Sequence, residues 1–392
     1  MGSVAERTVV VGAGVAGCAI AGRLARTGEV IVLDAGPRVV AEDVPVDVHR
    51  ALATPELTHR DLAVRRVADG PLVAYPAGRG VGGGALVNGL VIDDRSGPLP
   101  AETVETAEFG AVDRTLARAL PVRPLVLARR EGRRVAIAEH LLGDAEVRPG
   151  ATVSALMLDG DRVEGVETDS GPIEADHVVV AAGAFSSPRL LLAAGLGGAD
   201  VGLGLQDHPS VTVPLTRSSG PAGPVSGAVA RIGSVEVLPV NRLGASSEPD
   251  RAGIVVALLD PVSRGRVTLD AIDLNLLDPT TDDEARLVDG VVAVMREVGP
   301  HLAAEGLALD PSVPDPDDRG ALTQWVRSEV ASSAPAYTHA AGSCSVGVID
   351  DRHRVHGAGG LSLLDASVLP GVPSGSMMTA ILARALHSPL GR

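Results

Sequence analysis

The chain has 392 residues, of which 45% are hydrophobic and 21% are charged. A chain of this length and composition can bury more than one small core, which predicts two domains or one large two-part body. The formal net charge is −15, and every basic side chain is an arginine because the sequence contains no lysine. An acidic surface repels phosphate groups, which excludes nucleic acids and anionic lipids as favoured partners.

Cysteine usage and hydropathy indicate a cytoplasmic protein. The two cysteines, Cys18 and Cys344, are too few for a disulfide framework or a metal site, and they are compatible with a reducing compartment. Residues 1–7 lack the apolar core of a signal peptide. No apolar run reaches the roughly 18 residues that a membrane-spanning helix needs, so we expect no transmembrane segment.

The first clear unit is a strand, a helix and a second strand between Thr8 and Asp34. Residues 8–11 are a short β-branched run that predicts a buried parallel strand. Residues 18–27 predict a helix, and residues 29–33 predict a second buried strand. Their order is that of a β-α-β unit.

The glycines between the first strand and the helix have the Gly-x-Gly-x-x-Gly spacing. Gly12 allows a tight turn, Gly14 allows a pyrophosphate to approach the backbone, and Gly17 allows the helix to pack closely on the strand. Asp34 lies at the end of the second strand, at the spacing expected for a carboxylate that binds ribose hydroxyls. This unit predicts a dinucleotide site but leaves NAD and FAD open, because both carry the same ADP moiety.

Further elements follow along the chain. Residues 146–167 alternate apolar and polar side chains on either side of a Gly-Asp turn signal. Residues 177–182 predict a strand, 183–188 a turn, and 189–194 the start of a helix. Two more helices are predicted, one over residues 283–298 and one that begins near Ser376 or Met377.

A second glycine-rich segment covers residues 76–89. Its sequence is Pro-Ala-Gly-Arg-Gly-Val-Gly-Gly-Gly-Ala-Leu-Val-Asn-Gly. It resembles the glycine-rich segment of the glucose-methanol-choline (GMC) family of oxidoreductases, which runs beside the pyrophosphate and the flavin. Successive glycines let backbone N–H groups approach a cofactor without Cβ atoms in the way. Further matches occur in the family's order, so the resemblance spans nearly the whole chain: residues 181–191, 204–209, 260–269 and 339–379.

The resemblance implies a short, actinobacterial member of this family with a fold of α/β class. It implies a discontinuous Rossmann-type FAD-binding domain and an α+β substrate domain with an antiparallel sheet. We expect the FAD-binding domain to comprise residues 1–95, 138–212 and 340–392. The substrate domain is expected at 213–339, with a reduced lid or connecting segment at 96–137.

The resemblance also assigns residues to FAD. Val153 stands where a backbone contact to the adenine is usual, and Asp365 and Ala366 stand where the backbone approaches the flavin phosphate and ribityl chain. Val87 replaces the histidine through which some relatives attach FAD, so we expect non-covalent FAD. Besides Gly12, Gly14, Gly17 and Asp34, the expected FAD-binding residues are Gly82, Gly83, Asn88, Gly89, Val153, Asp365, Ala366 and Met377.

Two positions match the family's catalytic residues. His339, in Tyr-Thr-His-Ala-Ala-Gly-Ser-Cys, matches the catalytic histidine, and an imidazole with a pKa near neutrality suits a base that removes a hydroxyl proton. Ser376 stands where the family has a second histidine or an asparagine, and a serine can hydrogen-bond to a substrate oxygen. His208 and His356 lie within other family motifs, and for both we favour a structural role.

The resemblance therefore predicts an enzyme that oxidises a small-molecule alcohol to an aldehyde or ketone by hydride transfer to flavin N5. We expect a dehydrogenase that passes its electrons to an unidentified acceptor other than oxygen. Two alternatives stay open. Because Ser376 replaces the histidine or asparagine that is usual in the family, one alternative is an FAD-containing lyase or another non-redox enzyme. The other alternative is a non-catalytic flavoprotein. It is suggested by the reduced lid and by Gly84 and Ala85, which stand where the family has small hydroxyl residues.

Overall fold

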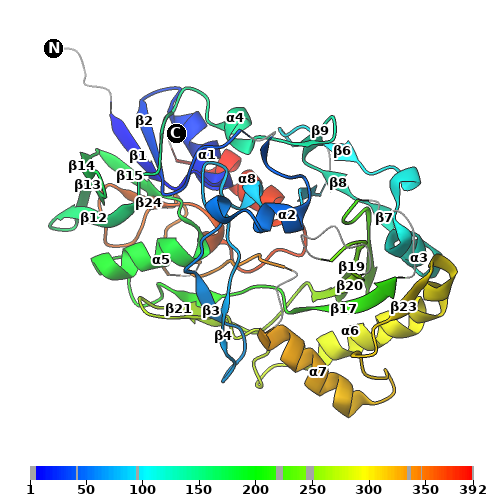
Figure 1. Cartoon of the computed structure of the whole chain (residues 1–392). Coiled ribbons are helices and arrows are strands. Elements are labelled where there is room, and N and C mark those ends of the chain that lie inside the picture. The colour runs from blue at the N-terminus through cyan, green and yellow to red at the C-terminus, as the bar shows by residue number, and fades with distance from the viewer. Residues whose placement is uncertain are drawn as a thin grey trace.

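A five-stranded parallel sheet lies at one end of the molecule (Figure 1). A computed structural model describes residues 6–40, 43–93, 97–217, 224–243, 251–332, 337–345 and 347–390. The predicted β-α-β unit is confirmed, with helix α1 at Val15–Leu24 between strands β1 and β2. The sheet has the order β11 (Glu146–Pro149), β2 (Glu29–Asp34), β1 (Arg7–Val11), β15 (His177–Val180) and β24 (Leu361–Leu363).

Side-chain alternation in this sheet produces two cores. Val10 and Val32 point to the face covered by α1 and by the C-terminal helix α8 (Met377–His387). Val9 and Ile31 point to the opposite face, where a small antiparallel sheet packs on them. That sheet consists of β12 (Val153–Asp159), β13 (Arg162–Thr168) and β14 (Gly171–Glu174).

Two local predictions are wrong. Residues 146–149 do not join the following hairpin but form β11, which pairs in parallel with β2. Residues 183–188 are no turn, because helix α5 (Gly183–Ala194) begins at Gly183 and contains Pro188. Proline removes the hydrogen bond to the carbonyl four residues earlier. That carbonyl, of Ala184, instead accepts a hydrogen bond of 2.6 Å from the Ser343 hydroxyl, so a tertiary contact compensates for the proline.

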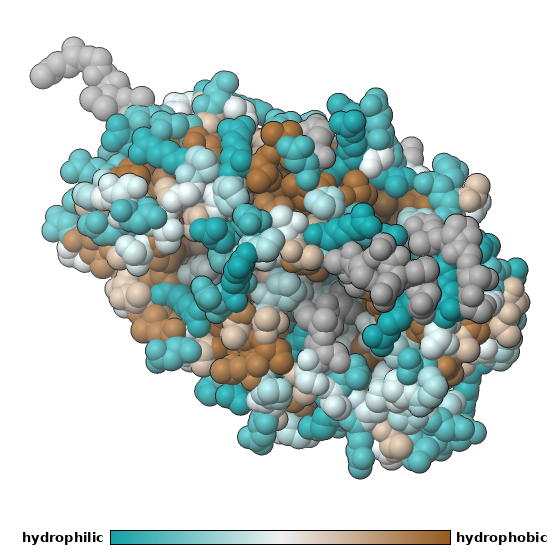
Figure 2. All heavy atoms as spheres, in the orientation of Figure 1, coloured by the Kyte–Doolittle hydropathy of each residue, from teal (hydrophilic) through white to brown (hydrophobic). Residues whose placement is uncertain are grey.

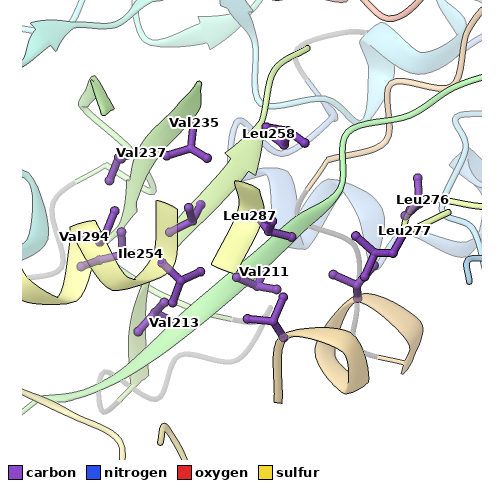
Figure 3. Packing of buried hydrophobic residues seen from close by; sticks show 14 of the residues in the cluster. Val211, Val213, Val235, Val237, Ile254, Leu258, Leu276, Leu277, Leu287 and Val294 are labelled. Carbon is purple, nitrogen blue, oxygen red and sulfur yellow. The ribbon is translucent and has the colours of Figure 1, made fainter. Parts of the chain in front are cut away.

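A six-stranded antiparallel sheet forms the other main layer. Figure 3 shows how Val211, Val213 and Ile254 on one face of it meet Leu287 and Val294 of helix α6. The predicted helix over 283–298 is confirmed as α6 (Asp283–Val298), and helix α7 (Arg319–Ser332) packs beside it. The strand order is β23 (Leu307–Leu309), β17 (Ser210–Arg217), β20 (Arg251–Leu258), β19 (Val235–Val240), β18 (Ala228–Ile232) and β7 (Arg123–Pro124).

Smaller sheets connect the two layers. Helix α3 (Ala111–Ala119), from the expected connecting segment, packs against β19 and α6. One small sheet has the order β5 (Val91–Ile92), β8 (Val126–Leu127) and β6 (Glu102–Thr103). The other has the order β16 (Leu203–Leu205), β21 (Gly265–Val267), β22 (Ile272–Asp273), β3 (Ala63–Arg65) and β4 (Leu72–Ala74).

The surface is mostly hydrophilic on the face drawn in Figure 2, with smaller hydrophobic areas between polar residues. This agrees with the strongly acidic composition. Within the described part of the chain, no helix combines the length and the apolar character that crossing a membrane requires.

The C-terminal helix α8 is anchored through a buried histidine. The ring of His353 accepts a hydrogen bond of 3.1 Å from Arg384 Nε at Nε2, and its Nδ1 lies 3.1 Å from the Ser388 hydroxyl. Arg23 of α1 donates to the carbonyls of Ala385 and Ser388 at the end of the same helix. Burial, and secondarily the charge of Arg384, lowers the pKa of His353 to about 4.

This depressed pKa predicts a loss of stability in acid. Between about pH 4 and 6.5 the unfolded chain binds more protons at His353 than the folded chain does, so the free energy of unfolding falls as the pH falls. We expect His353→Gln to reduce this fall by about 1 to 2 kcal/mol between about pH 7.5 and 5. Urea unfolding of both proteins at the two pH values measures the difference, and parallel losses in both would contradict the prediction.

Candidate active site

A cavity of about 1740 Å³ lies between the parallel sheet and the six-stranded sheet. Sites for single small ligands usually measure roughly 300–1,000 Å³, so this one has room for a large cofactor and a second molecule. One part is lined by the turn after β1 and by the second glycine segment. The opposite part is lined by strands β17 to β20 and by the segment that carries His339.

The turn after β1 is built to receive an anion. Gly14 caps α1 in an extended conformation, and no side chain bonds to the free N–H groups of the first turn. A helix N-terminus with free N–H groups attracts phosphate. The Asp34 carboxylate accepts hydrogen bonds of 2.9 Å from the Ala13 N–H and 2.8 Å from the Gly36 N–H, which fixes its position at the cavity edge. Burial raises its pKa.

The glycines fall into two groups. A Cβ atom on Gly17 would lie 1.9 Å from the Gly12 carbonyl oxygen, and one on Gly83 would lie 2.8 Å from the Gly14 Cα, so these glycines permit close backbone packing. A Cβ on Gly14, Gly84, Gly89 or Gly183 would meet no protein atom within 4 Å, although all four line the cavity. Bare backbone that faces open space is what a flavin dinucleotide needs, so the residues present fit FAD.

Most of the predicted cofactor and catalytic residues converge on this cavity. Gly17 and Gly82 do not line it; they support its wall, Gly17 through helix packing and Gly82 through an N–H bond of 2.8 Å to the Ala13 carbonyl. The lining residues among those predicted are Gly12, Gly14, Asp34, Gly83, Asn88, Gly89, Val153, His339, Asp365, Ala366, Ser376 and Met377.

Asp365 holds two loops of the cavity together. Its carboxylate accepts hydrogen bonds from the Gly183 N–H at 2.8 Å, the Ser187 hydroxyl at 2.5 Å and the Ser367 N–H at 2.7 Å. These bonds place the N-terminus of α5 beside the end of β24. The backbone at Asp365 and Ala366, rather than the Asp365 carboxylate, is thereby presented to the cavity.

A buried arginine clamps the loop that ends in Asn88 and Gly89. The Arg134 guanidinium is 3% exposed and donates to the carbonyls of Ala85, Asn88 and Pro45, at 3.0 Å, 3.0 Å and 3.1 Å, and to the Asn88 side chain at 3.0 Å. Burial lowers its pKa to about 10, so it remains charged at neutral pH. Arg134 therefore fixes the glycine-rich loop against residues 45–46.

We expect Arg134→Lys to weaken FAD binding about tenfold. An ammonium group cannot reproduce the planar fork of donors, so buried carbonyls lose their partners and the loop loosens. Titration of the apoprotein with FAD measures the change. Arg133→Lys is the matched control, because Arg133 is exposed and should leave the affinity unaltered. Equal FAD affinity in both variants would contradict this role of Arg134.

His339 lies in a cluster of rings at the wall of the cavity. Its ring centroid is 5.0 Å from that of Tyr337 and 5.3 Å from that of His208, with the rings edge to face. The His339 Nδ1 atom is buried and has no hydrogen-bond partner among the described residues. The Tyr337 hydroxyl donates to Glu236 Oε1 at 2.5 Å, and His208 Nδ1 lies 2.9 Å from the Leu258 carbonyl.

Asp207 positions the backbone of both histidines. It accepts hydrogen bonds from the His339 N–H at 2.9 Å and the His208 N–H at 2.7 Å. Its other oxygen accepts a bond of 2.6 Å from the Tyr75 hydroxyl, which in turn accepts one from the Ala340 N–H. Burial raises the pKa of Asp207 to about 6. One buried carboxylate thus ties together three chain segments around His339.

Both histidines are uncharged at neutral pH. Burial, reinforced by the nearby His208, lowers the pKa of His339 to about 3. Burial also lowers the pKa of His208 to about 4. A neutral imidazole carries one N–H group and one lone pair. His339 is therefore in the protonation state that a base requires, but its pKa lies below the near-neutral value expected from the sequence, because burial disfavours the imidazolium.

Ser376 lines the cavity as the N-cap of α8. Its hydroxyl donates to the Val91 carbonyl at 2.8 Å and accepts from the Thr379 N–H at 3.3 Å. A hydroxyl has one donor and two acceptor sites. The donor is already used, so Ser376 can accept one further hydrogen bond but cannot donate to a ligand in this arrangement.

The two cysteines take no part in this chemistry. Cys18 and Cys344 are both buried and free. Burial raises the pKa of each thiol to about 12, so neither forms a thiolate near neutral pH. Among the described residues there is also no group of three or more histidine, cysteine or acidic side chains that could hold a metal ion.

Sequence analysis missed Asp207, Tyr75, Tyr337 and Arg134, and it assigned His208 a structural role without placing it beside His339. Asp207 and His208 lie in a segment that matches the GMC family, and Tyr337 lies two residues before His339. The family segment and the position close to His339 could therefore have pointed to Asp207, His208 and Tyr337. No local pattern marks Arg134, whose role depends on contacts with segments about 50 and 90 residues away in the chain.

Solved structures share this fold along its whole length. Pyridoxine 4-oxidase from Mesorbium loti aligns with a TM-score of 0.78 over 97% of each chain, at 22% identity. A formate oxidase aligns with a TM-score of 0.81 over 98% of this chain and 97% of that one, at 18% identity. This chain therefore has the fold of these proteins.

Sequence comparisons give the family. Two models described as GMC oxidoreductase match residues 126–210 and 261–385. A GMC-type oxidoreductase of Rhodococcus erythropolis is 30% identical over 74% of this chain and 67% of its own length. A 5-(hydroxymethyl)furfural oxidase of Methylovorus is 26% identical over 93% of this chain and 94% of its own length. The chain belongs to the GMC oxidoreductase family and is an FAD-dependent oxidoreductase that acts on CH–OH donors.

Proposed function

We propose that this protein oxidises a small-molecule alcohol to an aldehyde or ketone, with His339 as the base, and that it passes the electrons to an acceptor other than oxygen. The observation that carries the proposal is the position of His339. It is a neutral imidazole at the wall of a cavity whose other wall is the bare backbone of two glycine segments. This arrangement supports a proton acceptor and a cofactor that share one cavity.

FAD, when bound, supplies the hydride acceptor. The chain supplies the base and its orientation. In its neutral form His339 has one ring nitrogen with a lone pair, and this nitrogen would accept the hydroxyl proton of the alcohol. Asp207 and Tyr75 hold the backbone around His339, and the edge-to-face contacts with Tyr337 and His208 restrict its ring. A base held in this way can remove the proton without a large reorganisation.

Ser376 has a supporting role in this proposal. The alcohol has a single hydroxyl proton, which goes to His339, so the Ser376 hydroxyl can hydrogen-bond to the substrate oxygen only by turning its own proton away from the Val91 carbonyl. Its present bonds keep the start of α8 in place. We propose non-covalent FAD because position 87 is a buried valine, which offers no nucleophile for attachment. Two free, buried cysteines are compatible with our proposed location in the cytoplasm.

The choice between dehydrogenase and oxidase is tested by reoxidation of the reduced enzyme. The enzyme is reduced anaerobically by an alcohol and then mixed with buffer that contains either dissolved oxygen or a quinone. We expect the flavin absorbance to return much faster with the quinone. Equally fast return with oxygen alone would show an oxidase. A flavin that no alcohol reduces would favour the lyase alternative, to which the loss of the usual residue at Ser376 points.

A further inference from the structure

The side chains on the cavity face of the six-stranded sheet indicate which kind of substrate the cavity can bind. Because side chains alternate along a strand, the residues between those packed on α6 point to the opposite face of the sheet, and several of them line the cavity. Val229 of β18, Leu238 and Val240 of β19, and Val255 of β20 line the cavity on this face. The wall nearest to His339 is therefore aliphatic on three adjacent strands.

Leu238 lies at the centre of this wall. It packs against two clusters of buried hydrophobic side chains, one that includes Val229 and Leu127 and one formed by Val240, Val255 and Ala257, against which Tyr337 also packs. Leu127 belongs to β8, so the aliphatic lining continues from the six-stranded sheet to this strand. Since the Tyr337 ring contacts His339, the aliphatic surface continues up to the proposed base.

Two of the charges that this sheet presents to the cavity compensate each other, while Arg251, at the first position of β20, is a further charge that lines the cavity. Arg231 and Glu236 are opposite each other in the register of β18 and β19, and their side chains form an ion pair at 3.8 Å. Glu236 also accepts from Tyr337, and Arg231 donates to the Ser374 carbonyl at 2.7 Å. At the cavity edge, Arg242 is paired with Asp47.

We propose that the substrate is an uncharged alcohol with an aliphatic body, which lies along the wall centred on Leu238. This proposal rests on the proposed alcohol oxidation. An apolar body gains about 25 cal/mol per Å² on leaving water for such a wall. A charged group placed there would lose its hydration without gaining an available partner of opposite charge. The wall therefore selects for an apolar substrate and against cationic and anionic alcohols.

A chain-matched series tests the proposal on the FAD-loaded enzyme: hexanol, aminohexanol as the cation and hydroxyhexanoate as the anion. The dissociation constant of each is measured in the FAD-loaded His339→Ala variant, whose flavin should stay oxidised during the titration, from the perturbation of the flavin absorbance. We expect hexanol to bind at least about tenfold more tightly than either charged analogue. Binding of aminohexanol or hydroxyhexanoate as tight as that of hexanol, or no binding of hexanol, would overturn the proposal.

Variants of Leu238 add a second test. Leu238→Gln should raise the dissociation constant of hexanol about tenfold, while Leu238→Met, which keeps an apolar side chain, should restore most of the affinity. Leu269→Gln is the matched control, because Leu269 is 54% exposed and does not line the cavity. Thermal melting confirms that each variant folds. Unchanged hexanol binding in folded Leu238→Gln would overturn the proposal.

The proposed alcohol oxidation and the proposed aliphatic substrate can be contradicted independently of each other. If hexanol binds more tightly than its charged analogues but no alcohol reduces the flavin, the aliphatic site stands and the proposed oxidation is wrong. If aminohexanol or hydroxyhexanoate is bound and oxidised best, the oxidation stands and the aliphatic substrate class is wrong.

Discussion

Replacing His339 with alanine should slow reduction of the flavin by alcohol about 10² to 10⁴-fold, the usual range for the loss of a general base. His339 is the neutral imidazole that lines the cavity next to Tyr337 and His208. Its removal leaves the glycine segments and α1 untouched, so FAD binding should be retained. The measurement is anaerobic stopped-flow absorbance at saturating alcohol.

His356→Ala is the matched control for this variant. His356 is exposed and does not line the cavity, so the same substitution there should leave the rate unchanged. An equal rate in His339→Ala and the unmodified protein would contradict the assignment of the base. A loss of FAD in His339→Ala would show instead that the residue supports the cofactor site.

The second large effect is expected from two substitutions in the first glycine segment. Gly17→Ala should reduce the stability of the fold, whereas Gly14→Ala should weaken FAD binding. A methyl group on Gly17 would lie 1.9 Å from the Gly12 carbonyl oxygen, and the backbone must move to make room. We expect Gly17→Ala to lower the free energy of unfolding of the apoprotein by about 3 kcal/mol or more.

Gly14→Ala should behave in the opposite way. Gly14 has φ −71° and ψ −174°, which alanine adopts without strain, and no protein atom lies within 4 Å of the added methyl group. The methyl group instead projects into the space expected for the pyrophosphate. We expect unchanged stability of the apoprotein and FAD binding that is at least about tenfold weaker. Unchanged FAD affinity in Gly14→Ala would show that the pyrophosphate does not lie there.

The sequence predicts those parts of the fold that depend on residues close together in the chain. The β-α-β unit follows from β-branched runs and from glycines whose roles depend on near neighbours, and α6 follows from apolar side chains at helical spacing. The resemblance to the GMC family, rather than periodicity, led to His339 and to the second glycine segment. Family membership is confirmed, whereas the roles of His339 and Ser376 stay predictions.

The parts that the sequence did not predict have tertiary causes. Helix α5 tolerates Pro188 because Ser343, far along the chain, bonds to the freed carbonyl. β11 joins the parallel sheet because β2 offers it an edge. The role of Asp207 depends on three N–H and O–H donors that come together when the chain folds. Such partners lie outside any local window of sequence.

The central claim is that this chain binds FAD and uses it to oxidise an alcohol with His339 as the base. The most direct measurement is the anaerobic absorbance spectrum of the purified protein before and after addition of alcohols. We predict a yellow protein whose flavin bands bleach with an uncharged aliphatic alcohol, and a His339→Ala protein that is yellow but does not bleach on the same timescale. A colourless protein that cannot be reconstituted with FAD, or bleaching that is unaffected by His339→Ala, would contradict the account.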